Sequence, residues 1–267
     1  SHYIKRFNST KLNKEELLEI AKHIKSLSNP KFKLMITPFD EDSVEWALDS
    51  NVDLIKIASC SANDWPLLEK ASNSNIPIVA STGGLEINAI DNLVSFFRHR
   101  AVDFSIMHCI SVYPTQPEDC NLLFIKTLKK RYPKLSIGWS THEPPTDTNL
   151  VIAAISSGAE LLERHICLPK EGKPQNAYSS TPSELQNWLN SIEMTYKILG
   201  DAEFEERVNE VKSIRLLSRG AYAKEEIKKG SKIELSNIFY AFPLLNDGQH
   251  TSSSISFPSM ALKDIKK

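Results

Sequence analysis

Short apolar runs alternate along most of the chain with stretches of helical periodicity. Six runs are rich in branched residues and do not alternate strictly with polar ones, which is typical of strands buried on both faces of a parallel sheet. These runs cover residues 34–37, 54–58, 76–80, 104–107, 135–139 and 160–163. Helices are predicted over 42–48, 64–72, 86–98, 122–132 and 147–157, with two more over 14–27 and 183–199. Asp42, Asp64 and Asp147 are the predicted N-caps of three of them.

Repeated strand–helix units with right-handed crossovers form either an open doubly wound sheet or a closed barrel. The residues that follow each run distinguish an open sheet from a barrel. Every run ends in polar, chemically competent residues. An open sheet gathers its ligand groups at one switch point, whereas a barrel gathers them from all strand ends. We therefore predict a TIM-type (β/α)8 barrel. The turn over 81–84 fits a phosphate cradle but is no G-x-G-x-x-G fingerprint, so a dinucleotide site is not expected.

The pattern changes at about residue 201. A charged stretch over 203–215 predicts a linker helix, and short strands are predicted over 219–223 and 227–233, followed by a Ser-rich loop over 251–259. The predicted domains are a barrel over 1–200, a linker helix over 201–216 and a small β-rich module over 217–267.

Composition narrows the class of protein. The 267 residues are 41% hydrophobic and 24% charged, which is ordinary for a globular protein. Thirty-two basic and 33 acidic residues leave a net charge of −1, so no global basic field draws nucleic acid or an anionic membrane. No apolar run approaches the length of a membrane span, and residues 1–6 lack a signal-peptide core. The four cysteines contain no C-x-x-C pair and are expected as reduced thiols in a cytoplasmic protein.

At the strand ends the chain resembles the sialic acid synthase family. Six stretches match that family in order: Thr37-Pro38-Phe39-Asp40; Lys56-Ile57-Ala58-Ser59; Ser81-Thr82-Gly83; His108-Cys109 with Tyr113-Pro114 and 118–122; Gly138-x-Ser140-x-His142; and Glu163-Arg164-His165. The stretch 226–230 is similar to the start of the family's antifreeze-like C-terminal domain. The resemblance runs from about residue 34 to 240.

This resemblance implies a reaction that joins phosphoenolpyruvate to an N-acyl amino sugar, or its phosphate, and releases phosphate to give a nine-carbon 2-keto acid. It implies a divalent cation, Mn²⁺ or Mg²⁺, held by His142 and His165. The groups implied for the carboxylate and phosphate of phosphoenolpyruvate are Lys56, Ser59, Ser81 and Ser140. Tyr113 would face the sugar, and Glu163 would act as acid/base or orient water. A homodimer is also implied.

The chain also departs from the family pattern, mainly on the expected sugar side. Ser61 and Thr141 stand where the family usually has acidic residues, and Gln175 replaces the Asp of a Gly-Pro-Asp turn. Ser111 occupies a position that the family fills with Asn or Ser, and we include Ser111 and Gln175 among the candidate substrate-binding residues. The arginine that the family's C-terminal domain sends into a neighbouring active site is replaced near Phe242. The first two barrel strands have no match before Leu34, and we expect the chain to be a fragment rather than to borrow them from a partner.

Two other functions stay open. Lys56 lies between Ile55 and Ile57, and a desolvated lysine in such a strand suits a Schiff-base aldolase. The altered positions also fit a synthase-like binding or scaffold protein that keeps a phosphate pocket without sugar chemistry.

Overall fold

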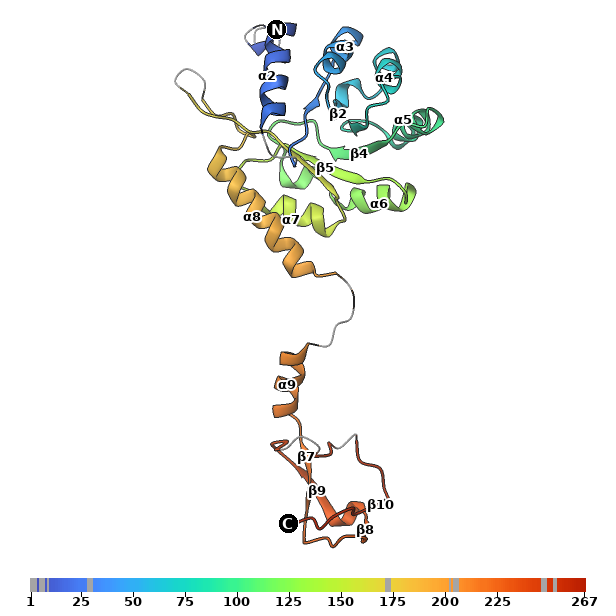
Figure 1. Cartoon of the computed structure of the whole chain (residues 1–267), viewed down its shortest axis with the longest axis vertical. Helices are drawn as coiled ribbons and strands as arrows, with labels where there is room; N and C mark the ends of the chain where they lie inside the picture. Colours follow the sequence, from blue (N-terminus) through green and yellow to red (C-terminus); the bar gives the residue numbers. More distant parts are fainter. Residues whose placement is uncertain are drawn as a thin grey trace. The chain divides into compact units, whose positions relative to one another are not determined.

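The computed structural model describes residues 4, 8, 10–27, 31–170, 174–201, 203, 207–245, 249–251 and 254–267. The chain divides into two compact units, Ser1–Gly200 and Asp201–Lys267 (Figure 1). The candidate site residues all lie in the first unit.

The first unit is built on a six-stranded sheet in which every neighbouring pair is parallel and the strands follow one another in chain order. The strands are β1 (Met35–Ile36), β2 (Leu54–Ile57), β3 (Ile78–Ser81), β4 (Phe104–Cys109), β5 (Ile137–Thr141) and β6 (Leu161–Arg164). The sheet curls into a half-barrel with helices along its outer side (Figure 1). All six predicted strands are confirmed, and the fold is that of an incomplete TIM-like barrel.

The helices fall where the periodicity predicts them. They are α2 (Lys14–Ser26), α3 (Glu41–Asp49), α4 (Trp65–Ser72), α5 (Ile87–His99), α6 (Leu123–Arg131), α7 (Asn149–Ser156) and α8 (Pro182–Leu199). Asp64 caps α4 as predicted, but the N-cap of α3 is Asp40 rather than Asp42. The Asp40 carboxylate accepts a bond of 2.7 Å from the Ser43 backbone N–H, and the Asp40 backbone N–H donates to the Ser43 hydroxyl oxygen at 3.0 Å, so the reciprocal bonds decide the boundary. The N-cap of α7 is Thr148 rather than Asp147.

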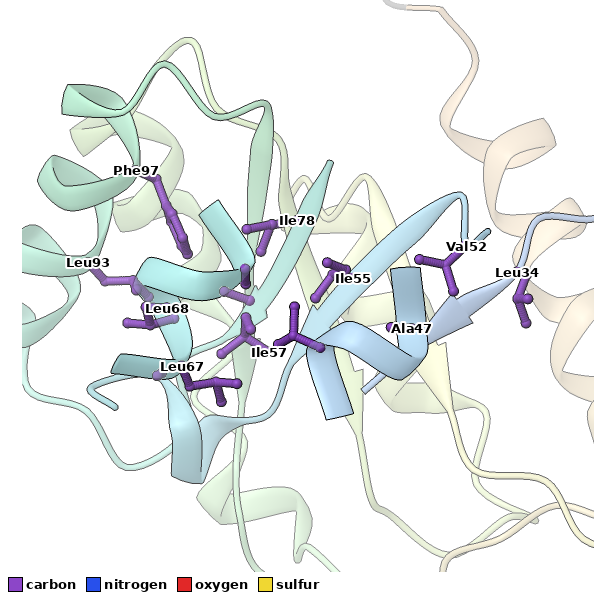
Figure 2. Packing of buried hydrophobic residues seen from close by; sticks show 14 of the residues in the cluster. Leu34, Ala47, Val52, Ile55, Ile57, Leu67, Leu68, Ile78, Leu93 and Phe97 are labelled. Carbon is purple, nitrogen blue, oxygen red and sulfur yellow. The ribbon is translucent and has the colours of Figure 1, made fainter. Parts of the chain in front are cut away.

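Alternate residues of each strand face opposite sides of the sheet. The outward set, which includes Ile55, Ile57 and Ile78, packs against Leu67, Leu68 and Phe97 of the covering helices (Figure 2). The central strands β3 and β5 are buried on both faces, as predicted, whereas both residues of β1 and all four of β6 are only partly buried or exposed. Those two strands form the edges of the sheet, where one side lacks a neighbouring strand.

The second unit contains α9 (Val208–Leu216) and four short strands: β7 (Gly220–Ala223), β8 (Lys232–Ile233), β9 (Ile238–Ala241) and β10 (Ser259–Met260). They pair antiparallel as β7 with β9 and β8 with β10 around a small core of Ala223, Ile227, Ile233, Ile238 and Ala261. Residues 204–206 of the predicted linker helix lie outside the described part of the chain. None of the helices that the structure describes combines the length and apolar character needed to cross a bilayer.

Candidate active site

A bonded chain of polar side chains lies on the inner face of the half-barrel. The Lys56 ammonium of β2 donates to the Ser81 hydroxyl of β3 at 2.8 Å and lies 3.5 Å from Glu163 Oε2 of β6. The Ser140 hydroxyl of β5 donates to Glu163 Oε1 at 2.7 Å. Lys56, Ser81 and Ser140 are each at least nine-tenths buried. Four of the predicted residues, taken from four different strands, therefore form one connected group.

Two predicted serines meet around Gly83, directly after β3. The Gly83 backbone N–H donates to the Ser59 hydroxyl at 2.9 Å. A Cβ on Gly83 would lie 2.5 Å from the Ser111 hydroxyl oxygen and 2.9 Å from that of Ser59, so only glycine leaves room for both. The turn predicted as a phosphate cradle thus has two hydroxyl groups and a backbone donor gathered at one point.

The two candidate metal ligands, His142 and His165, lie directly after β5 and β6. Their ring centroids lie 5.2 Å apart, and His142 Nδ1 lies 3.0 Å from the Ile110 carbonyl oxygen. That contact fixes the orientation of the imidazole ring and leaves Nε2 as the nitrogen that can face a metal ion. Carbonyl groups orient metal-binding histidines in this way. Burial lowers the pKa of His142, and although the bond to Ile110 acts in the opposite direction, the net shift is downward and favours the neutral ring that binds metals.

Two tyrosines surround this histidine pair, and only one was predicted. The ring centroid of Tyr113 lies 4.3 Å from that of His142. The Tyr178 ring lies 5.2 Å from both Tyr113 and His165, and it meets His165 nearly edge-on. Tyr178 is the only Phe, Tyr or Trp between β6 and α8, a signal that sequence reasoning could have used.

Two other polar residues, Gln175 and His108 of the fourth matched stretch, point elsewhere. The Gln175 amide nitrogen donates to Glu184 Oε2 at 2.7 Å and to the Ser179 carbonyl oxygen at 2.8 Å, which ties its loop to the start of α8. His108 faces outward from β4, where its ring lies 5.1 Å from Trp139 and burial lowers its pKa. Neither residue contributes a contact to the Lys56 chain.

A buried ion pair lies behind the two histidines. Arg164 Nη1 and Glu143 Oε1 are 2.6 Å apart, and the two side chains are 2% and 0% exposed. Arg164 also donates to the Ser180 hydroxyl and lies over the Trp188 ring of α8. Sequence reasoning treated Arg164 only as part of a motif and gave Glu143 no role.

The arrangement suits capture of an anion beside a polarised carbonyl group. A lysine ammonium and several hydroxyl groups are the donors that phosphate and carboxylate accept. Two imidazoles with centres 5.2 Å apart can share one cation at nitrogen–metal distances of about 2 Å. In the part of the chain that the structure describes, no cluster of three or more His, Cys, Asp or Glu side chains could hold a metal ion.

Comparison with known proteins places this geometry in a family. The NeuB family model matches residues 1–204. An N-acetylneuraminate-9-phosphate synthase of Drosophila melanogaster is 32% identical over 253 residues, which cover 85% of this chain and 66% of the fly protein. The chain therefore spans slightly less than two thirds of the fly protein's length.

Solved structures agree with this assignment. One solved structure is that of a Chromobacterium violaceum protein whose name refers to spore coat polysaccharide biosynthesis. It is 37% identical to this chain, with a TM-score of 0.87 over 100% of this chain and 79% of that chain. An N-acetylneuraminic acid synthetase of Leptospira borgpetersenii, solved with citrate, is 30% identical with a TM-score of 0.69, covering 76% of this chain and 70% of that one. The sequence match, the half-barrel fold and the order of the strand-end motifs together show that this chain belongs to the NeuB family.

Proposed function

We propose that this chain catalyses the condensation of phosphoenolpyruvate with an N-acyl amino sugar, or its phosphate, to give a nine-carbon 2-keto acid. The observation that carries the proposal is the bonded chain Lys56–Ser81 and Ser140–Glu163, which lies on the inner face below His142 and His165. Family membership supports the same reaction, because the fly relative is named as an N-acetylneuraminate-9-phosphate synthase.

Lys56 would bind the anionic groups of phosphoenolpyruvate together with the nearby hydroxyl groups. Its side-chain nitrogen lies within 3.5 Å of three oxygen atoms, those of Ser81, the Ile57 carbonyl and Glu163, so its three N–H bonds already have acceptors and a bound anion would replace one of them. Ser59 and the Gly83 N–H extend the donor set. In this largely buried site each charge–dipole contact is stronger than it would be in water.

Glu163 would act as acid/base at the new hydroxyl group or orient the water that adds at C2. One carboxylate oxygen accepts from Ser140 and the other faces Lys56, so both bonds fix its orientation. The side chain remains 36% exposed, which gives it access to the substrate or to water. Addition of the phosphoenolpyruvate methylene to the aldehyde requires a proton at the new hydroxyl group, and release of phosphate requires water at C2. A carboxylate in this position suits either transfer.

His142 and His165 would hold Mn²⁺ or Mg²⁺, and their imidazole spacing fits one shared ion. When bound, the cation would act as a Lewis acid on the aldehyde oxygen of the sugar. Tyr113, which packs on His142, would face the sugar. We also propose that the protein is a cytoplasmic homodimer. The second unit would be an antifreeze-like domain, and the stretch 226–230 supports that identity.

A Schiff-base aldolase is the second candidate, because Lys56 is a lysine only 6% exposed inside a barrel-type sheet. Its three oxygen neighbours favour the role of hydrogen-bond donor over that of nucleophile. Incubation with pyruvate and borohydride separates the two functions, since only an imine route leaves a covalent adduct on Lys56. Mass spectrometry of the peptide containing Lys56 reads the result.

The decisive experiment measures phosphate release from phosphoenolpyruvate with Mn²⁺ or Mg²⁺ and a panel of N-acyl hexosamines and their 6-phosphates. We expect release that depends on both the sugar and the cation, with a 2-keto acid identified by mass spectrometry. His142→Ala with His165→Ala should remove that release. His99→Ala, on α5, is the matched control and should leave it unchanged.

The absence of sugar-dependent release above the metal-only background would exclude the synthase reaction for this chain. Retained binding of phosphoenolpyruvate in that case, measured by calorimetry, would favour the scaffold function. Equal metal content in wild type and the double histidine variant would exclude the proposed metal site.

A further inference from the structure

The two strands that carry the candidate metal ligands stop pairing just before those residues. The register of β5 and β6 ends with Thr141 opposite Arg164, and His142 and His165 lie one residue further along. Beyond that last pair the sheet ladder does not set the separation of the two imidazoles. A pair of residues that share one ion needs to be held to within about 0.5 Å, so some other contact has to supply this precision.

The Arg164–Glu143 pair lies in the position to do so. Glu143 comes directly after His142 in the chain, and Arg164 directly before His165. Arg164 pairs with Thr141 on the outward face of the sheet and its guanidinium lies over Trp188 of α8, so the ion pair that it forms with Glu143 lies on that outward side. The pair therefore joins the two strand ends from behind without contacting the inner face.

Its burial separates this pair from the other ion pairs of the described residues. Arg164 and Glu143 are 2% and 0% exposed, whereas every other ion pair in that part of the chain has one partner at least 36% exposed. Burying two charges is unfavourable by several kcal/mol for each ion, and an apolar pair of similar volume is often at least as stable. Stability alone therefore gives no reason for charged residues here, whereas a fixed geometry does.

Arg164 extends the same restraint to a third segment. Its guanidinium donates to the Ser180 hydroxyl, and Ser180 N–H donates to the His165 carbonyl oxygen at 2.9 Å. The loop that presents Tyr178 to the histidine pair is thus attached to Arg164 as well. One side chain links the end of β5, the end of β6 and the loop before α8.

We propose that Arg164 and Glu143 are positioning residues, whose buried ion pair holds His142 and His165 at the separation that a shared divalent cation requires. This inference rests on the metal role given to the two histidines under the proposed function. Neither residue of the pair touches substrate. Partners that orient metal ligands from behind typically change metal affinity by about 10- to 100-fold when they are replaced.

The test uses the whole chain and measures Mn²⁺ affinity by electron paramagnetic resonance titration, independently of turnover. The main variant replaces both partners together, Glu143→Met with Arg164→Met, because removal of both charges avoids an unpaired buried ion. We expect its midpoint of chemical denaturation to stay near that of wild type while Mn²⁺ affinity falls by about 10- to 100-fold. Pulsed resonance should also show weaker imidazole nitrogen coupling to the bound Mn²⁺.

A matched control removes a different cross-element ion pair. Asp91→Ala with Arg131→Ala breaks the contact between α5 and α6, and Mn²⁺ affinity should stay as in wild type. If the methionine double variant does not fold, Glu143→Gln combined with Arg164→Gln replaces it. This variant also removes both charges, and it should weaken Mn²⁺ binding.

The outcomes separate the two proposals. Wild-type Mn²⁺ affinity and nitrogen coupling in a folded Glu143→Met, Arg164→Met variant would overturn the positioning role while leaving the metal site intact. Wild-type Mn²⁺ affinity in the His142→Ala, His165→Ala variant would overturn the metal site, and the positioning role with it. Weakened binding in the ion-pair variants but not in the Asp91, Arg131 control would support both.

Discussion

The two faces of the same six strands differ in chemistry although their residues alternate along one chain. The outward face carries Ile55, Ile57, Ile106 and Trp139, which are buried completely under the helices. The inner face carries Lys56, Ser81, Ser140 and Glu163, which are joined by two hydrogen bonds and one ion pair. Residues that follow one another in a strand therefore differ in role: those on the outward face contribute to stability, and those on the inner face are candidates for the chemistry. A substitution should mainly change either the stability or the activity.

The largest expected effect is the loss of Trp139, which lies on the outward face directly before Ser140. Trp139→Ala should lower the free energy of unfolding by about 3–5 kcal/mol, because a fully buried aromatic side chain leaves a cavity. Guanidinium denaturation followed by circular dichroism measures it. A loss below about 1 kcal/mol would show that the outward face contributes less to stability than its burial implies.

The reciprocal change is Lys56→Met on the inner face. We expect phosphate release from phosphoenolpyruvate to fall at least 100-fold, equivalent to about 2.7 kcal/mol of transition-state stabilisation, while the denaturation midpoint changes little. Methionine keeps the length of the side chain but removes its donors. Lys197→Met on the exposed surface of α8 is the control and should match wild type. An equal loss of stability in Lys56→Met and Trp139→Ala would contradict the division between the faces.

A smaller effect is expected at Gly83, where side chains of the candidate site lie close to the glycine backbone. Gly83→Ala would place its Cβ within 3.0 Å of the Ser111 and Ser59 hydroxyl oxygens and of the Cys109 carbonyl oxygen. The hydroxyl groups would have to turn away, so the KM for phosphoenolpyruvate should rise by about tenfold, or roughly 1.4 kcal/mol. Steady-state kinetics with the sugar at saturation tests this. An unchanged KM would mean that Ser59 does not bind phosphoenolpyruvate.

The smallest effect concerns the helical layer outside the sheet. Arg131 and Tyr132 hold the pKa of Asp91 at about 2, below the value of about 3.9 of an unfolded aspartate. A lowered folded-state pKa contributes stability above the unfolded pKa and loses it as the pH falls toward the folded pKa. Wild type should therefore lose more stability than Asp91→Asn between about pH 4 and pH 2. Denaturation curves at several pH values compare the two proteins, and parallel curves would contradict the prediction.

Much of the fold could be predicted from local pattern. The six apolar runs became the six strands, and the helices formed within a few residues of their predicted bounds, because burial and periodicity act locally. The N-caps of α3 and α7 were the exceptions, since Asp40 and Thr148 compete with nearby Asp42 and Asp147 for the same role. Only the folded backbone at each helix start selects one of them.

The candidate site was predicted less evenly. Strand-end motifs led to Lys56, His142 and His165, but the hydrophobic pattern alone did not show that His108 faces outward against Trp139. Tyr178 and Glu143 were missed because they lie in a loop and beyond a strand end, where no periodicity indicates direction. Gln175 was chosen because it stands in place of the Asp of the family turn, and its amide bonds to the start of α8. The functional roles of all these residues stay predictions.

The sequence by itself determined the order of strands and helices, the parallel sheet and the family, because these depend on hydrophobic period and on short motifs read in order. The tertiary structure decided which polar residues meet. Lys56 and Glu163 lie far apart in the chain, and their 3.5 Å contact exists only because sheet register and curvature bring β2 and β6 toward one inner face. A one-residue change of register would reverse the direction of every side chain in a strand, so the site depends on pairing that no local pattern encodes.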